Sequence, residues 1–549
     1  METLLTIIRS VPTPILYALS PFAAIAVILA LTRVITTVNY YRALQQFKDS
    51  PHGGQKIVSP PQIPYTIPWL GNSLDFLRPS PGAFWSELFS YHPRETGVCT
   101  LLMGGRKSHI VFSPTTVQAI FKARTPSRDI FDFDLYIQVF KMTHDQAQNA
   151  YNGKHSEEVM NSKYMIKFER VNELTEHFTK SLEDVLSKDS KEIVEKGEIG
   201  LYEWLRDRMF TASCYALMGE KLKEMYPNFC EDFYGFDGEF LKFFFRFPEF
   251  LIKDAYQRRD RIFDNLEKWS AEMHRLSGGT PVDPEGPAWE PFFGSRLNRA
   301  RHLDYKARGL NSRSSAALDL GITFAISSNA IPATGWMLFH LLNPKNPSLL
   351  ERALKEINAA TKEDGNLDIA TLVSQPLLQS LWTETLRLYA DVLVTRNLPE
   401  DITLPLDESG KHHVLFRAGD NVFAPSFLGH RDDNVWSTED APYDVFHADR
   451  FLVKDPKTGQ EAFSMSRTTG KFFPFGGGKT ICPGRIFAKQ EAIGALAMVL
   501  LKFDFDVKGY IDIDKKPTKD FPGMPKAFPG SGALSPGGDM KVKISRRVW

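Results

Sequence analysis

A glycine-rich loop near the carboxyl end presents a cysteine at the start of a helical pattern. The loop occupies residues 475–484 (FGGGKTICPG) and contains Cys482, and apolar residues recur at helical spacing through residues 485–501. Glycines let the backbone turn and approach a flat ligand where side chains would clash. The amides and the dipole of a following helix favour a thiolate over a thiol. The pattern is typical of a loop that presents sulfur, with an inert buried cysteine as the alternative.

The loop resembles the cysteine-ligand loop of cytochromes P450. The family pattern, Phe-x-x-Gly-x-x-x-Cys-x-Gly, is met in full by Phe475, Gly478, Cys482 and Gly484. The resemblance implies a haem b cofactor that contacts these residues and Gly476, with Cys482 as the axial ligand of the iron. It also implies a monooxygenase that uses O2 and NADPH-derived electrons, because a thiolate ligand favours O–O cleavage and hence oxidation of an unactivated carbon.

A second motif resembles the structural ion-pair network of the same family. Glu384 and Arg387 stand three residues apart, on one face of a helix, where such a pair is ordinarily exposed to solvent. Residues 446–451 (FHADRF) resemble the family's Phe-x-Pro-Glu-Arg-Phe element, in which Arg450 occupies the arginine position. The resemblance implies a buried network of Glu384, Arg387 and Arg450 that holds the cysteine loop through charge-assisted hydrogen bonds.

The helical stretch over residues 316–342 is expected to cross above the haem, and it departs from the family pattern. Most members carry an acid followed by a threonine there, and these two side chains relay protons to bound dioxygen. This chain places Asn329 and Ala330 at the two positions, and Thr334 follows. Pro332 should break the hydrogen-bond ladder of the helix. We expect Asn329 and Thr334 to be the catalytic polar residues of this stretch.

Two segments resemble one branch of the family, which holds the sterol and bile-acid 7α- and 12α-hydroxylases and prostacyclin synthase. They are residues 328–336 (SNAIPATGW) and 480–484 (TICPG), and they are similar to fungal members. The branch favours oxidation of a large apolar substrate, such as a sterol, a terpenoid or a polycyclic secondary metabolite. Ala330 leaves open an isomerase or dehydratase that rearranges an oxygenated substrate without a reductase. A non-enzymatic haem-binding protein is a third alternative.

Further resemblances concern the haem propionates and the redox partner. Arg396 resembles the strand arginine that pairs with a propionate, and an exposed strand arginine is the alternative. We see no resemblance to a flavin domain and therefore expect a separate NADPH–cytochrome P450 reductase. Its acidic face would dock on a basic patch that includes Lys479, Arg485 and Lys489.

The elements that position these residues are predicted to be mainly α-helical with small β-sheets, in a cytochrome P450 fold. Helical periodicity dominates residues 114–388, and proline-rich residues 59–64 form a stiff hinge. We expect a membrane anchor over residues 1–35, a linker with the hinge over residues 36–75 and one catalytic domain over residues 76–549. Strands are predicted near residues 98–102, 110–112, 392–394, 402–404 and 421–424.

The amino terminus carries a long apolar segment. Residues 15–31 (ILYALSPFAAIAVILAL) hold no charge and are nearly long enough to cross a bilayer as a helix, which Pro21 would kink. A removed signal peptide and a buried core helix are the alternatives. Basic residues follow the segment, so the positive-inside tendency places the catalytic domain in the cytosol. We expect a single-pass protein of the endoplasmic reticulum that contacts membrane lipid.

The composition argues against several other classes of protein. Lysine and arginine together number 66, as do aspartate and glutamate, and neither sign forms a long block, so we expect no nucleic-acid partner. The four cysteines are widely spaced, which argues against a disulfide framework and a structural zinc site. Many apolar residues supply a large core and a pocket for an apolar small-molecule substrate.

Overall fold

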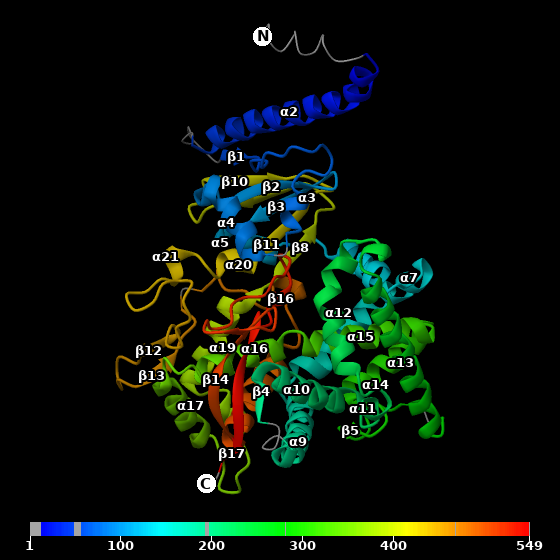
Figure 1. Ribbon diagram of the computed structural model, residues 1–549, viewed down its shortest axis with the longest axis vertical. Coiled ribbons are helices and arrows are strands. Elements are labelled where there is room, and N and C mark those ends of the chain that lie inside the picture. The colour runs from blue at the N-terminus through cyan, green and yellow to red at the C-terminus, as the bar shows by residue number, and fades with distance from the viewer. Residues whose placement is uncertain are drawn as a thin grey trace. The chain divides into compact units, whose positions relative to one another are not determined.

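The computed structural model of the chain is mainly helical with several small sheets (Figure 1), which confirms the predicted fold class. It describes residues 13–48, 56–78, 80–192, 197–279, 282–466 and 468–547. The chain divides into two compact units. Unit 1 comprises Met1–Ser127 and Val394–Pro425, and unit 2 comprises Arg128–Leu393 and Ser426–Trp549.

Unit 1 contains two small sheets, with strand orders β1-β10-β9 and β2-β3-β11-β8. In the second sheet, parallel pairing of β3 with β11 sets Ile110 opposite Phe423, and both side chains are buried. Strands from two distant parts of the chain therefore build one sheet. The strands are β1 (Lys56–Val58), β2 (Val98–Met103), β3 (Arg106–Val111), β8 (Leu393–Asn397), β9 (Ile402–Pro405), β10 (His412–Phe416) and β11 (Asn421–Pro425); the unit's helices are α2 (Thr13–Lys48), α3 (Ser73–Phe76), α4 (Pro81–Tyr91) and α5 (Pro114–Lys122).

Helix α2 combines an apolar segment with a docked end. It spans 36 residues, includes Pro21, and has a mean hydropathy of 2.0 within Pro21–Phe47, where its most apolar window is not buried. Toward its end, Tyr40 is fully buried and its hydroxyl donates to the Tyr91 carbonyl at 3.2 Å. The helix is long and apolar enough to cross a bilayer, and it continues past residue 35 to the contact of Tyr40 with α4. Residues 1–12 of the predicted anchor lie outside the described residues.

Unit 2 holds most of the helices, together with small sheets. The sheets have the strand orders β15-β14-β17-β4, β16-β7, β12-β13 and β5-β6. The strands are β4 (Glu198–Gly200), β5 (Trp289–Glu290), β6 (Gly294–Ser295), β7 (Ala390–Asp391), β12 (Leu452–Lys454), β13 (Glu461–Phe463), β14 (Phe503–Asp512), β15 (Pro517–Thr518), β16 (Gly532–Ala533) and β17 (Gly538–Arg546). The helices are α6 (Asp129–Asp134), α7 (His144–Asn152), α8 (Lys154–Asn161), α9 (Phe168–Glu192), α10 (Leu201–Met218), α11 (Leu222–Met225), α12 (Phe229–Phe244), α13 (Lys253–Leu276), α14 (Arg296–Ala307), α15 (Ser312–Ser327), α16 (Ala330–Leu341), α17 (Pro347–Ala359), α18 (Ile369–Leu372), α19 (Pro376–Tyr389), α20 (Ser426–Gly429), α21 (Asp433–Trp436) and α22 (Arg485–Lys502).

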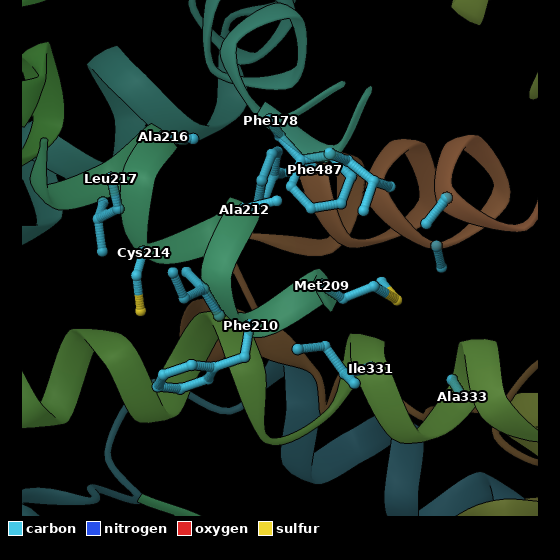
Figure 2. Packing of buried hydrophobic residues seen from close by; sticks show 14 of the residues in the cluster. Phe178, Met209, Phe210, Ala212, Cys214, Ala216, Leu217, Ile331, Ala333 and Phe487 are labelled. Carbon is cyan, nitrogen blue, oxygen red and sulfur yellow. The ribbon is translucent and has the colours of Figure 1, made fainter. Parts of the chain in front are cut away.

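The core of unit 2 forms where α9, α10, α16 and α22 meet (Figure 2). Phe178 of α9 packs edge-to-face on Phe487 of α22, with ring centroids 6.3 Å apart. Met209 of α10 and Ile331 of α16 belong to the same buried cluster, and each is fully buried. Burying a side chain of this size contributes about 1.5–3 kcal/mol. The contact of Phe487 fixes the first turns of α22, the helix that follows the cysteine loop.

The stretch predicted over residues 316–342 is two helices rather than one. Helix α15 ends at Ser327 and α16 begins at Ala330. Pro332 explains the division, because it lacks the N–H that would bond to the carbonyl of Ser328, and its ring clashes with that carbonyl in a continuous helix. The predicted effect of Pro332 on the ladder is therefore confirmed, and the break falls beside Asn329.

Candidate active site

Two glycines in the left-handed region shape the cysteine loop. Gly476 has φ of 69° and Gly478 has φ of 67°, where a residue with a side chain would be strained. The loop closes where the N–H of Cys482 donates to the Phe475 carbonyl at 3.0 Å. These turns deliver Cys482 to a fixed place directly before α22.

The sulfur of Cys482 lies close to Gly484 and Met165. A Cβ on Gly484 would stand 3.8 Å from the Sγ atom and 3.4 Å from the Cε atom of Met165. Burial raises the pKa of the Cys482 thiol, while the N–H groups of Gly484 and Arg485 act to lower it. The pKa of Cys482 is therefore raised, whereas the position of the residue before a helix predicts a lowered pKa. The sequence pattern does not reveal the burial of the sulfur. The N–H groups still fit a sulfur held as a thiolate by a metal cation.

Glu384, Arg387 and Arg450 form one buried ion-pair network. Arg387 donates from Nε and Nη2 to the two carboxylate oxygens of Glu384, at 2.7 and 2.8 Å. Arg450 donates from Nε to Oε1 of Glu384 at 3.0 Å. The three side chains are 0%, 0% and 3% exposed, so the charges compensate one another away from water. Further guanidinium N–H groups donate to the backbone carbonyls of His430, Tyr443, Trp436, Pro442 and Val445.

His430 connects this network to the cysteine loop. Its carbonyl accepts a hydrogen bond from Arg387 at 2.9 Å, and its Nε2 accepts the N–H of Phe473 at 3.1 Å. Complete burial lowers the pKa of His430 well below its usual range, so the ring is neutral and can accept. The sequence analysis missed this residue. A lone histidine outside any motif carries no signal of such a role.

Helices α15 and α16, here called the distal helices, expose a narrow face. Ala325 and Asn329, one turn apart, are exposed, whereas most of α15 and α16 is buried. The amide oxygen of Asn329 accepts the N–H of Ala533 at 3.0 Å. Thr334 is fully buried, and its hydroxyl donates to the carbonyl one turn earlier at 2.9 Å. The structure does not bring Thr334 to the face that carries Asn329.

The residues predicted for the propionate and for the reductase belong to different units of the chain. Arg396 lies on β8 in unit 1, is 5% exposed and donates to the Thr395 carbonyl at 2.8 Å, whereas the cysteine loop belongs to unit 2. Lys479 is exposed, and Arg485 and Lys489 are half-buried. Burial lowers the pKa of Lys489 to about 8, so the side chain is still mostly protonated at neutral pH. The roles of these four residues stay predictions.

Comparisons with known proteins identify the family. Residues 61–527 match the family described as Cytochrome P450. The cytochrome P450 monooxygenase efuG of Hormonema carpetanum is 28% identical over 568 residues, which cover 96% of each chain. The monooxygenase calL of Penicillium decumbens is 26% identical over 523 residues, 88% of this chain and 95% of the relative. Cholesterol 7-alpha-monooxygenase of Cricetulus griseus is 28% identical over 363 residues, 63% of this chain and 65% of the relative. The chain belongs to the cytochrome P450 family.

Family membership defines the class of chemistry. The chain is a cytochrome P450 monooxygenase, and the family is one of haem-thiolate enzymes that receive electrons from a redox partner. The predicted resemblance to fungal members and to 7α-hydroxylases is confirmed. A bound haem supplies the oxygen chemistry in such enzymes. The residues of the loop fit that group, because one half-buried sulfur lies beside the N–H groups of Gly484 and Arg485.

Proposed function

We propose that haem b binds against the cysteine loop with Cys482 as its axial ligand. Gly476 and Gly478 support this proposal because they form the loop without side chains that would oppose a flat group. Phe475 supports it because its carbonyl holds the N–H of Cys482. Gly484 supports it because its N–H group acts to lower the pKa of the Cys482 thiol. The N–H groups of Gly484 and Arg485 beside the half-buried sulfur of Cys482 are the observation that carries the proposal.

The ion-pair network is proposed to hold this loop in place. Arg387 bonds to the carbonyl of His430, whose ring in turn accepts the Phe473 N–H, so the network reaches a residue two positions before the loop through two hydrogen bonds. Glu384 fixes both arginines and also accepts the N–H of His447 at 3.0 Å. Such a scaffold keeps a metal ligand within the narrow geometry that its chemistry needs. Arg396 is proposed to pair with a haem propionate.

The substrate is proposed to be large and apolar, such as a sterol, a terpenoid or a polycyclic secondary metabolite. Phe240 of α12 and Phe324 of α15 are half-buried and stack with centroids 4.3 Å apart and planes 20° apart. Phe324 directly precedes Ala325 in α15, and we place the substrate against the exposed face of Ala325 and Asn329. The stacked rings are half-buried and add flat apolar surface to α12 and α15. A relative is named for its action on cholesterol, which supports the sterol class.

The partner and membrane setting are proposed from the same family and from α2. NADPH–cytochrome P450 reductase would supply the electrons, docking where Lys479 and Arg485 lie beside the cysteine loop. Helix α2 would anchor the chain in the endoplasmic reticulum, with the catalytic part in the cytosol. Asn329 and Thr334 are the polar side chains predicted to be catalytic, and the burial of Thr334 favours a structural role for it.

The test of function is a reconstituted reaction with purified reductase. The protein and reductase are combined in lipid vesicles, and a panel of sterols, triterpenoids and polycyclic compounds is supplied under ¹⁸O₂. Substrate-dependent NADPH consumption with one labelled oxygen in the product supports the monooxygenase on that substrate class. A rearranged product formed without NADPH would instead support the isomerase or dehydratase alternative suggested by Ala330. Cys482→Ala is the control, and its activity should be lost in either case.

A further inference from the structure

The side chain of Asn329 does not cap the helix that it precedes. Asn329 stands at the N-cap of α16 but makes no capping hydrogen bond. A capping side chain bonds to the second or third N–H of its helix, and the third residue here is Pro332, which has none. The amide oxygen accepts the N–H of Ala533 at 3.0 Å instead. Asn329 therefore ties the break between the distal helices to a strand 204 residues later in the chain.

This contact lies on the edge of β16 that faces away from β7. One edge of β16 pairs with β7, and the N–H of Ala533 points from the other edge to Asn329. The Oδ1 atom thus takes the place of a carbonyl from a third strand. Gly532 has φ of +79°, and a Cβ there would stand 2.8 Å from Oδ1, which is closer than real Cβ atoms come. The approach of the amide to β16 therefore depends on a glycine at position 532.

Other bonds fix the flanks of the same segment, residues 528–535. The N–H of Gly530 donates to Oδ2 of Asp391 at 3.0 Å. The N–H of Leu534 donates to the Tyr389 carbonyl at 2.7 Å, and its carbonyl accepts the indole N–H of Trp336 at 2.7 Å. Among these hydrogen bonds, the one between Ala533 and Asn329 lies on the exposed face of the distal helices.

We propose that Asn329 is a positioning residue that sets the distance between the distal helices and residues 528–535, and thereby selects substrates by size. This inference rests on the proposed haem and substrate site, because that site places substrate on the face of Ala325 and Asn329. The Nδ2 group also donates to the Ser328 hydroxyl at 3.0 Å, so both ends of the amide are engaged. An amide gives up a proton poorly, and holding two partners fits its chemistry better than proton relay.

Amide hydrogen exchange in the holoenzyme tests the contact itself. Asn329→Leu removes both hydrogen bonds at similar volume, and the Ala533 amide should exchange on the order of tenfold faster, the factor given by one net hydrogen bond. Asn329→Asp keeps an acceptor for Ala533 and should leave this exchange unchanged. Ser328→Ala is the matched control, because it removes the second partner alone. Equal Ala533 exchange in Asn329→Leu and wild type overturns the proposal.

Azole binding tests the selection by size. Imidazole and the bulky azole ketoconazole are titrated by their spectral shift on the haem. Asn329→Leu should change the Kd of ketoconazole by roughly five- to tenfold, as expected for altered packing around a large ligand, and leave that of imidazole unchanged. Asn329→Asp should match wild type for both. An unchanged Kd for ketoconazole in Asn329→Leu overturns size selection. If wild type does not bind imidazole, the proposed haem site is contradicted, and the proposed selection of substrates by size is contradicted with it. The hydrogen exchange of Ala533 still tests the contact between Asn329 and Ala533 in that case.

Discussion

Glu384→Gln is the substitution that most directly perturbs the buried ion-pair network. It replaces a carboxylate that accepts from Arg387 and Arg450 with a neutral amide, and it leaves two positive charges uncompensated where side chains are 0–3% exposed. Breaking a buried pair in this way costs about 3–5 kcal/mol. At roughly 2.1 cal/mol/K of unfolding entropy per residue, this cost lowers the Tm of a 549-residue chain by roughly 3–4 °C. The haem content should fall as well, because the network holds the cysteine loop through His430.

The measurement is thermal unfolding followed by circular dichroism, with haem content read from absorbance. Asp449→Asn is a matched control, because Asp449 makes a similar two-bond contact with Arg352, at 2.8 and 2.9 Å, with side chains 38% and 37% exposed. Exposed pairs contribute about 0–1 kcal/mol, so the control should shift the Tm by less than about 1 °C. A Glu384→Gln protein with the Tm and haem content of wild type would refute the reasoning.

Two further predictions concern a buried acid and the docked end of α2. Burial raises the pKa of Glu491 to about 8, above its ordinary value of 4.5, so the folded state holds a proton that the unfolded chain releases. Stability should therefore fall by about 1.4 kcal/mol per pH unit between those two values. Glu491→Gln should reduce the fall in Tm between pH 5 and 8. Parallel curves of Tm against pH for Glu491→Gln and wild type would contradict this prediction. Tyr40→Phe removes the hydroxyl that donates to the Tyr91 carbonyl at 3.2 Å and lies within hydrogen-bond distance of Nδ1 of His92, at 3.0 Å, which costs about 1–3 kcal/mol locally. Proteolysis near the end of α2 should accelerate, and an unchanged rate would contradict the docking.

The sequence could predict the parts of the site that depend on local spacing. The glycines around Cys482 are adjacent in the chain, and their φ angles follow from the need for a turn without side chains. Glu384 and Arg387 share a helix face by spacing alone. Pro332 predicts the break in the distal helices because its missing N–H acts on the turn before it.

The sequence could not predict contacts that depend on tertiary packing. Thr334 was expected beside Asn329, but a helix residue five positions later is rotated by roughly 140° and points elsewhere. His430 bonds to Phe473 through the fold, and no motif announces it. The bond from Asn329 to Ala533 joins residues 204 positions apart and needs the course of the chain to be known. Likewise, burial of Cys482 reverses the direction of its pKa shift expected from the helix start alone.

The most direct test of the central claim is the carbon monoxide difference spectrum of the dithionite-reduced protein. Wild type should show the red-shifted Soret band of a thiolate-ligated haem, and Cys482→Ala should lack it while keeping the wild-type circular dichroism spectrum. A folded wild type without a haem band, or a Cys482→Ala protein that retains the red-shifted band, would contradict the assignment of Cys482 as the iron ligand.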